Sequence, residues 1–152
     1  MNSHLITNKP ALWIDGSQRI TAPLLPLFES LKHRQIATFK HPDRTCVYQE
    51  VKACQRLRKD NAELMNRQVA RYQKEGYPPF NGLVETAVLF RQPTVEVERF
   101  NYIWWEQIHT GSYRDQLSFN YSISKTGIQY VHIPGDRTKS PWFEFVPHGG
   151  SR

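Results

Sequence analysis

The hydrophobic pattern along the chain predicts strands that alternate with helices. Four apolar runs are typical of buried strands: Ala11 to Ile14, Gln35 to Phe39, Glu85 to Arg91 and the segment IQYVHI at 128–133. The stretches between them carry apolar residues at helical spacing. This order predicts the α/β class, with a mostly parallel sheet flanked by helices.

Capping residues and breakers set the expected helix ends. One helix is expected over Thr94 to Ile108, and Gly111 breaks it. A long helical region is expected from Val47. The residues expected to begin helices, as caps or in a capping box, are Thr21, Asp60 with Glu63, Thr94 and Ser112.

Composition and charge then narrow the class of protein. The chain has 152 residues, 39% of them hydrophobic and 12% aromatic, so it is expected to fold around a core. Its net charge of +6 favours anionic partners, which include nucleic acid, acidic lipid and phosphorylated small molecules. Since the chain contains no run of five like charges, we do not expect a dedicated nucleic-acid tail. Nucleic-acid binding is a third hypothesis that only the net charge suggests, and we do not expect a nucleic-acid partner.

The two cysteines indicate a reducing compartment, and the length of the apolar runs bears on membrane spans. Cys46 and Cys54 are eight residues apart near the start of an expected helix, which separates them too far for a disulfide. The N-terminal residues do not show the pattern of a signal peptide, and no apolar run has the length of a membrane span. We therefore expect a cytoplasmic protein without a transmembrane segment.

The first candidate for chemistry follows the first strand. Asp15, Gly16 and Ser17 come directly after the apolar run. In α/β sheets ligands gather beyond the carboxyl ends of strands, where a carboxylate can hold a divalent cation that bridges to substrate phosphates. Gly16 would let phosphates approach the backbone, and Ser17 would add a hydroxyl. The alternative is a simple Asp-Gly turn.

Three further candidates lie in the C-terminal half. Asp115 can position a sugar hydroxyl or contact the metal, and Gln116 can hydrogen-bond a reacting centre, although Ser112 and Asp115 also fit a capping box. His148, in the segment PHGG, can complete a Mn²⁺ shell, and the alternative is an exposed terminal histidine.

Two turn segments add candidates for anion and polyol binding. His41 and Arg44 follow a strand end, and arginine suits bidentate binding of anions. The alternative is a solvated turn. Asn81 and Gly82 suggest close backbone approach near a ligand, and Glu85 can accept hydrogen bonds from a polyol. The alternative is that Gly82 makes a turn and Glu85 pairs with a nearby arginine.

Two adjacent tryptophans offer a surface for stacking on a sugar ring. Trp104 and Trp105 lie in the expected helix, where neighbours point about 100° apart. Trp104 fits the apolar stripe and is expected in the core, which leaves Trp105 as the candidate for the acceptor.

Seven blocks of the sequence together resemble one family. In order, they are LWIDGS, ATFKHPDRTCVYQE, YQKEGYP, GLVETAVLFR, WWEQI, RDQLSFNYS and IPGDR with WFEFVPH. They cover nearly the whole chain and resemble the glycosyltransferase-like domain of plant mucilage and turgor-regulation proteins and their bacterial and viral relatives. The resemblance implies a GT-A type glycosyltransferase, of hexosyltransferase type and in polysaccharide biosynthesis. Its nucleotide-sugar donor would bind through Mn²⁺ or Mg²⁺.

The resemblance also implies roles for the candidate residues. Asp15 falls at the D-x-D type metal motif, with Ser17 in place of the second Asp, and His148 resembles the C-terminal metal histidine. Asp115 and Gln116 look like the paired D-Q beside the reacting sugar, with Glu85 as a third catalytic candidate. The expected donor-binding residues are Asp15, Gly16, Ser17, His41, Arg44, Arg91 and Arg114, and the expected acceptor-binding residues are Asn81, Gly82 and Trp105.

One departure from the family pattern leads to a second hypothesis. Only ten residues precede the first strand, whereas a GT-A domain begins with a βαβ region that binds the nucleotide. We expect residues 1–152 to form a single, truncated domain that lacks most of this N-terminal half and can associate through an exposed sheet edge. The alternative function is a non-catalytic remnant or carbohydrate-binding module without nucleotide binding.

Overall fold

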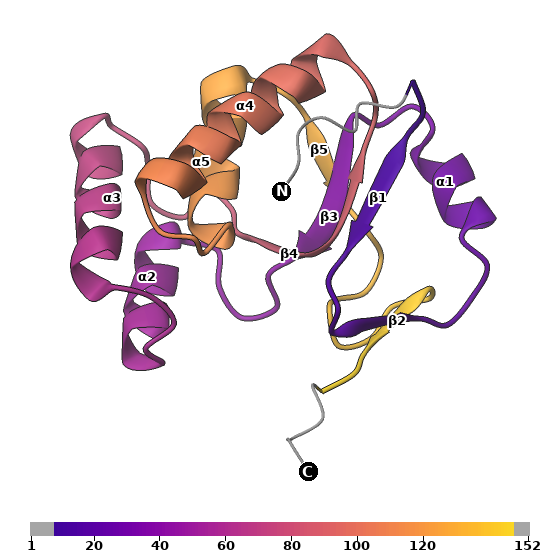
Figure 1. Cartoon of the computed structure of the whole chain (residues 1–152), viewed down its shortest axis with the longest axis horizontal. Coiled ribbons are helices and arrows are strands. Elements are labelled where there is room, and N and C mark those ends of the chain that lie inside the picture. Colours follow the sequence, from indigo (N-terminus) through magenta and orange to yellow (C-terminus); the bar gives the residue numbers. More distant parts are fainter. Residues whose placement is uncertain (1–7, 148–152) are drawn as a thin grey trace.

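A computed structural model describes residues 8–147, which form an α/β fold (Figure 1). The strands are β1 (Ala11–Ile14), β2 (Gln18–Ile20), β3 (Ile36–Lys40), β4 (Val84–Arg91), β5 (Tyr130–His132) and β6 (Phe143–Phe145). The helices are α1 (Leu25–Leu31), α2 (Val47–Arg56), α3 (Ala62–Lys74), α4 (Val95–Thr110) and α5 (Gln116–Thr126). The predicted α/β class and the four predicted strands are confirmed.

The main sheet is mostly antiparallel, so the prediction of a mostly parallel sheet is wrong. Its strand order is β1-β4-β3-β5. β4 pairs antiparallel with β1 and with β3, and only β3 and β5 pair in parallel. A continuous apolar run shows that a strand is covered on both faces, and it does not show the direction of the neighbouring strands.

The reversed direction of β4 places several candidate residues at one edge of the sheet. β1, β3 and β5 run one way and β4 runs the other, so the carboxyl ends of β1 and β3 meet the amino end of β4. The amide of Asp15 donates to the carbonyl of Ala87 at 2.9 Å, and the amide of His41 donates to the carbonyl of Leu83 at 3.0 Å. This edge therefore joins the segments after β1 and β3 to the start of β4.

Both faces of the sheet are covered, as Figure 1 shows, with α4 and α5 on one side and α1 on the other. Residues of β4 alternate between the two faces, because side chains along a strand point to opposite sides. Leu89 packs with Phe100 and Phe119 beneath α4 and α5, whereas Phe90 packs with Leu27 of α1. This double cover explains why Val88, Leu89 and Phe90 of β4 are apolar in succession.

A third core region joins α2 and α3 to α5. Val51 of α2, Met65 and Tyr72 of α3 and Tyr121 of α5 are buried in one cluster. The rings of Tyr72 and Tyr121 are stacked, with centroids 3.8 Å apart. This packing joins the helical pair α2–α3 to α5, the helix that Asp115 precedes.

A small second sheet was not predicted. β2 and β6 pair antiparallel, with Ile20 opposite Phe143. Phe143 is buried and its ring meets that of Phe39 edge-on at 6.3 Å. This sheet brings the segment after Asp15 against the C-terminal part of the described chain, and three-residue strands are too short to give a clear sequence pattern.

At two helices, the capping residue is a nearby residue and not the predicted one. Asn61, rather than Asp60, caps α3 by accepting from the amide of Leu64 at 2.9 Å. Asp115, rather than Ser112, caps α5. The Asp60 carboxylate instead accepts from the Ser112 hydroxyl at 2.5 Å. Both expected caps are thus used in a tertiary contact between the start of α3 and the segment before α5.

Of the other two predicted caps, one is confirmed and one is wrong. Thr94 caps α4 by accepting from the amide of Val97, as expected. Thr21 does not cap α1, which begins at Leu25 without a side-chain cap. α4 is the longest described helix at 16 residues, and no helix within residues 8–147 is long and apolar enough to cross a membrane.

The two cysteines are free thiols, as predicted. Cys46 precedes α2 and Cys54 lies within it, and both side chains are buried. Burial raises the pKa of Cys54 to about 11, and the charge of Glu50 adds to the effect. Neither thiol is presented to solvent for oxidation.

Candidate functional site

Asp15 is held in place by the residue two positions along. Ser17 donates to Asp15 Oδ1 through its backbone amide at 2.8 Å and through its hydroxyl at 2.5 Å. The predicted Asp-Gly turn is therefore present. A β-carbon added at Gly16 would meet no atom within 4 Å, which leaves open space beside the backbone at this turn. The turn and a ligand role for Asp15 are compatible.

Asp115 lies beside β4, and hydrogen bonds hold its carboxylate and its backbone carbonyl. Its Oδ2 accepts from the Thr86 hydroxyl at 2.8 Å, and its Oδ1 accepts from the Gln116 amide at 2.8 Å. Its backbone carbonyl accepts from Trp104 Nε1 at 3.1 Å. Sequence reasoning missed Thr86, and it placed Trp104 in the core without this bond. The carboxylate thus faces the edge of the sheet where β1 ends.

The two carboxylates influence each other. Burial raises the pKa of Asp115, while the hydrogen bond from Thr86 and the charge of Arg114 oppose that rise. The negative charge of Asp15 raises the pKa of Asp115 further. The fold therefore brings together two carboxylates that are 100 residues apart in the sequence, and their repulsion would be relieved by a cation.

Gln116 and Glu85 form a second contact at the same edge. Gln116 Nε2 donates to Glu85 Oε1 at 2.5 Å, and both side chains are buried. Arg137 lies 3.6 Å from the same oxygen, so Glu85 does pair with an arginine, as its alternative interpretation proposed. The carbonyl of Arg137 accepts from Gln18 Nε2 at 3.0 Å, which ties this arginine to β2. Sequence reasoning missed Arg137, although it lies in IPGDR, one of the blocks that resemble the family.

His41 and Arg44 belong to a buried cluster rather than to a solvated turn. His41 Nδ1 accepts from the amides of Asp43 and Arg44, both at 3.1 Å. Glu50 Oε2 accepts from Arg44 Nε at 2.5 Å and lies 3.5 Å from His41 Nε2. Glu50 was also missed, although an acid on the apolar stripe of a helix signals a buried partner.

Arg114 lies between the two clusters. Its Nη2 is 3.5 Å from Gln116 Oε1, and its charge lowers the pKa of Asp115 and opposes the rise at Cys54. Its Nε is buried without a hydrogen-bond partner among the described residues. A buried guanidinium donor without a protein acceptor is a position where a ligand oxygen would be favoured.

The remaining candidates contact other residues. Arg91 lies at the opposite end of β4, roughly 17 Å along the strand from Thr86, and bonds to Asn101. Trp105 is 42% exposed and stacks on His109. Asn81 lies near Tyr77 and opposes the rise that burial causes in the pKa of Tyr77, and Gly82 (φ +86°) lies close to Asn120 and Tyr130.

The structure describes one of the two predicted metal ligands. Asp15 is described, whereas His148 lies outside the described residues. Within residues 8–147, no group of three or more His, Cys, Asp and Glu side chains is placed to hold a metal ion. The pair of Asp15 and His148 therefore stays a prediction.

Comparison with known families defines the class of protein. The model of the TOD1/MUCI70 glycosyltransferase-like domain matches residues 4–133. This chain belongs to that family, which confirms the predicted resemblance. No curated protein and no solved structure matches the chain. The GT-A type therefore remains a prediction.

Proposed function

We propose that the chain transfers a sugar from a nucleotide-sugar donor to a glycan or other acceptor, with the help of Mn²⁺ or Mg²⁺. Membership of a glycosyltransferase-like family supports the reaction class. The observation that carries the proposal is the placement of Asp15 and Asp115 at one sheet edge, close enough for the charge of one to raise the pKa of the other.

The two carboxylates fit a divalent metal of the kind proposed. Mg²⁺ usually binds through one or two carboxylates, several waters and substrate phosphates, rather than through a complete protein cage. Asp15 and Asp115 would be its protein ligands, with His148 as a proposed third. The bound cation would neutralise negative charge on the leaving nucleoside diphosphate.

The surrounding residues would bind and orient the substrates. The open space at Gly16 would accept phosphates close to the backbone. The buried Nε of Arg114 would donate to a phosphate or sugar oxygen. Gln116, held by Glu85, would orient the sugar, and Arg137 would help to hold Glu85 in place.

A thermal-shift titration tests this function. We expect UDP or GDP to raise the melting temperature of the wild-type chain only when Mn²⁺ is present, because binding to the folded state stabilises it. Asp15→Asn should lose this shift. Glu29→Gln, which removes an exposed carboxylate of α1, is the matched control and should behave as wild type.

The opposite result would identify the alternative. A folded wild-type chain that gives no metal-dependent shift with either nucleotide would reject the donor site, and a carbohydrate-binding module without nucleotide binding would then be the better description.

A further inference from the structure

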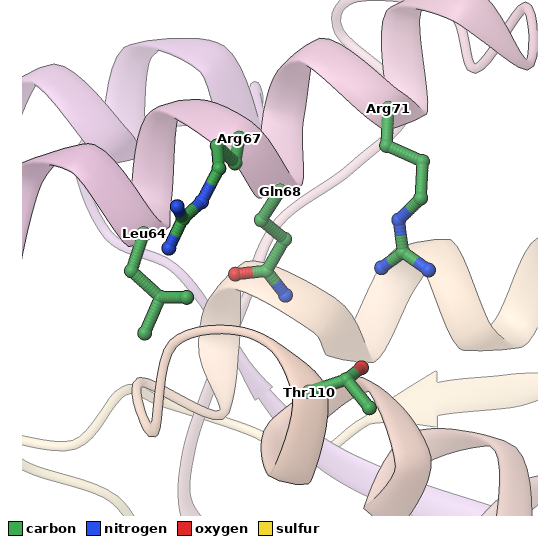
Figure 2. Close-up of a pocket in the computed structure, with 5 residues that line it drawn as sticks. All are labelled: Leu64, Arg67, Gln68, Arg71 and Thr110. Atoms are coloured by element: carbon green, nitrogen blue, oxygen red, sulfur yellow. The ribbon is translucent and has the colours of Figure 1, made fainter.

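A polar pocket of about 400 Å³ lies between α3 and the end of α4, and its lining includes Leu64, Arg67, Gln68, Arg71 and Thr110 (Figure 2). Figure 2 shows the side chains of Arg67 and Arg71 extending from α3 on either side of Gln68, toward the side on which Thr110 lies. Arg67 and Arg71 are four residues apart, so they share one face of the helix. None of these residues belongs to the sheet edge around Asp15 and Asp115.

Arg71 has a guanidinium whose positive charge helps to lower the pKa of Glu75 without a direct ion pair. Its Nη2 donates to Gln107 Oε1, and the group lies over the rings of Tyr72 and Tyr121 at 5.5 and 6.0 Å. No described residue forms an ion pair with it. Since a guanidinium carries five N–H donors, most of those of Arg71 remain for another acceptor.

Arg67 has only a weak partner. Its Nη1 lies 3.2 Å from Glu63 Oε1, and the two side chains are 67% and 78% exposed. Exposed pairs of this kind contribute little, because water and salt screen them and both side chains lose freedom. An anion in the pocket can therefore displace Glu63 from Arg67.

Gln68 forms a fixed wall of the pocket. Its Nε2 donates to the Tyr72 hydroxyl at 2.9 Å, and its Oε1 accepts from the Ser112 amide at 3.0 Å. Gly111 lies so close that an added β-carbon would come within 2.7 Å of the Gln68 side chain. These bonds leave Gln68 at most one N–H for a ligand, so the charged groups available to a ligand in the pocket are the two guanidiniums.

We propose that this pocket binds a phosphate-type oxyanion between the guanidiniums of Arg67 and Arg71. Two guanidiniums on one helix face can each donate two N–H groups to a tetrahedral oxyanion, which is the geometry that arginine suits best. The net charge of +6 attracts an anion to this surface at long range.

The test is a titration of the ¹⁵N-labelled full chain with inorganic phosphate, at constant ionic strength and without divalent metal. We expect saturable shifts of the Gly111 amide and of the Arg71 side-chain signal. Arg67→Gln and Arg71→Gln should each weaken binding at least fivefold, and the double variant should abolish it. Arg56→Gln removes the same charge from an exposed site in α2 and is the matched control.

A variant with the opposite sign sharpens the test. Glu63→Gln removes the competing carboxylate, so we expect phosphate to bind at least twofold more tightly. Shifts that do not saturate would overturn the proposal, and so would unchanged binding by the exposed-site variant Arg67→Gln. Asp15→Asn should bind phosphate like the wild type, which separates this site from the proposed donor site.

Discussion

The hydroxyl of Thr86 in β4 donates a 2.8 Å hydrogen bond to Asp115 Oδ2 at the start of α5. This bond links the sheet to the helix that covers it, and it orients the Asp115 carboxylate. Burial raises the pKa of this carboxylate, and the charge of Asp15 raises it further. Strand β4 thus positions the residue on which the proposed chemistry depends. Replacing Asp115 should separate function from stability.

Asp115→Asn should abolish metal-dependent nucleotide binding and stabilise the fold at neutral pH. Asparagine can still accept from the Gln116 amide, and it carries no charge to be buried or to repel Asp15. We expect a gain on the order of 1 kcal/mol in the free energy of unfolding, measured by urea denaturation at pH 7. A variant that is less stable and still binds nucleotide with metal would contradict the assigned role.

The same variant should change how stability depends on pH. Since burial raises the Asp115 pKa above its ordinary value of 3.8, the folded state keeps this proton at pH values where the unfolded state has lost it. The contribution of Asp115 is therefore complete below pH 3.8 and is lost as pH rises through the raised pKa. The stability advantage of Asp115→Asn should be absent at pH 3.5 and should grow between pH 4 and pH 7, and an advantage independent of pH would contradict this.

Three glycine substitutions should distinguish a glycine that leaves room for a ligand from glycines that the backbone conformation requires. Gly16→Ala meets no atom and no positive φ, so it should change stability by less than about 0.5 kcal/mol while it weakens nucleotide binding. Gly76→Ala faces only a φ of +77° and should cost about 1 kcal/mol. Gly82→Ala adds contacts of 3.1 and 3.2 Å with Asn120 and Tyr130, so it should cost about 1 kcal/mol more than Gly76→Ala.

Urea denaturation gives these stabilities, and the thermal shift with UDP or GDP and Mn²⁺ gives nucleotide binding. Wild-type nucleotide binding by a stable Gly16→Ala protein would mean that phosphates do not approach this turn.

Glu50→Gln should destabilise the fold without touching the carboxylate pair. Glu50 is 5% exposed and is the acceptor for Arg44, which also lies beside His41. Removing the charge leaves a partly buried guanidinium without its counter-ion, which should cost about 2 to 3 kcal/mol. Glu63→Gln breaks an exposed pair and should cost less than about 0.5 kcal/mol. Equal effects of the two variants in urea denaturation would reject the structural role of the His41 cluster.

The cysteines should react with a thiol reagent only when the fold opens. Both side chains are buried, and the pKa of Cys54 at about 11 keeps it protonated at pH 8. We expect labelling by Ellman's reagent to be slow in buffer and complete in urea, with two thiols per chain. Rapid labelling of the native protein would show that α2 is not packed as described.

Much of this architecture follows from local sequence. The four main strands and the helix expected over Thr94 to Ile108 were predicted, because apolar runs and helical spacing can be recognised in consecutive residues. Asp15 was predicted at a strand end for the same reason, and the ordered blocks were enough to identify the family. The caps were less certain, because Asp60 and Ser112 offer side chains that suit either a helix start or a tertiary bond.

Only the tertiary structure decided which strands pair and in which direction. The apolar run of β4 is compatible with either direction, and its reversal brings Thr86 and Glu85 to the ends of β1 and β3. The ion pairs of Arg137 and Glu50 also depend on the tertiary structure. Arg137 pairs with Glu85, which lies 52 residues away, and Glu50 pairs with Arg44, which lies 6 residues away in a turn. Local pattern determines what each segment becomes, whereas pairing direction and long-range contacts depend on how all segments bury their apolar faces together.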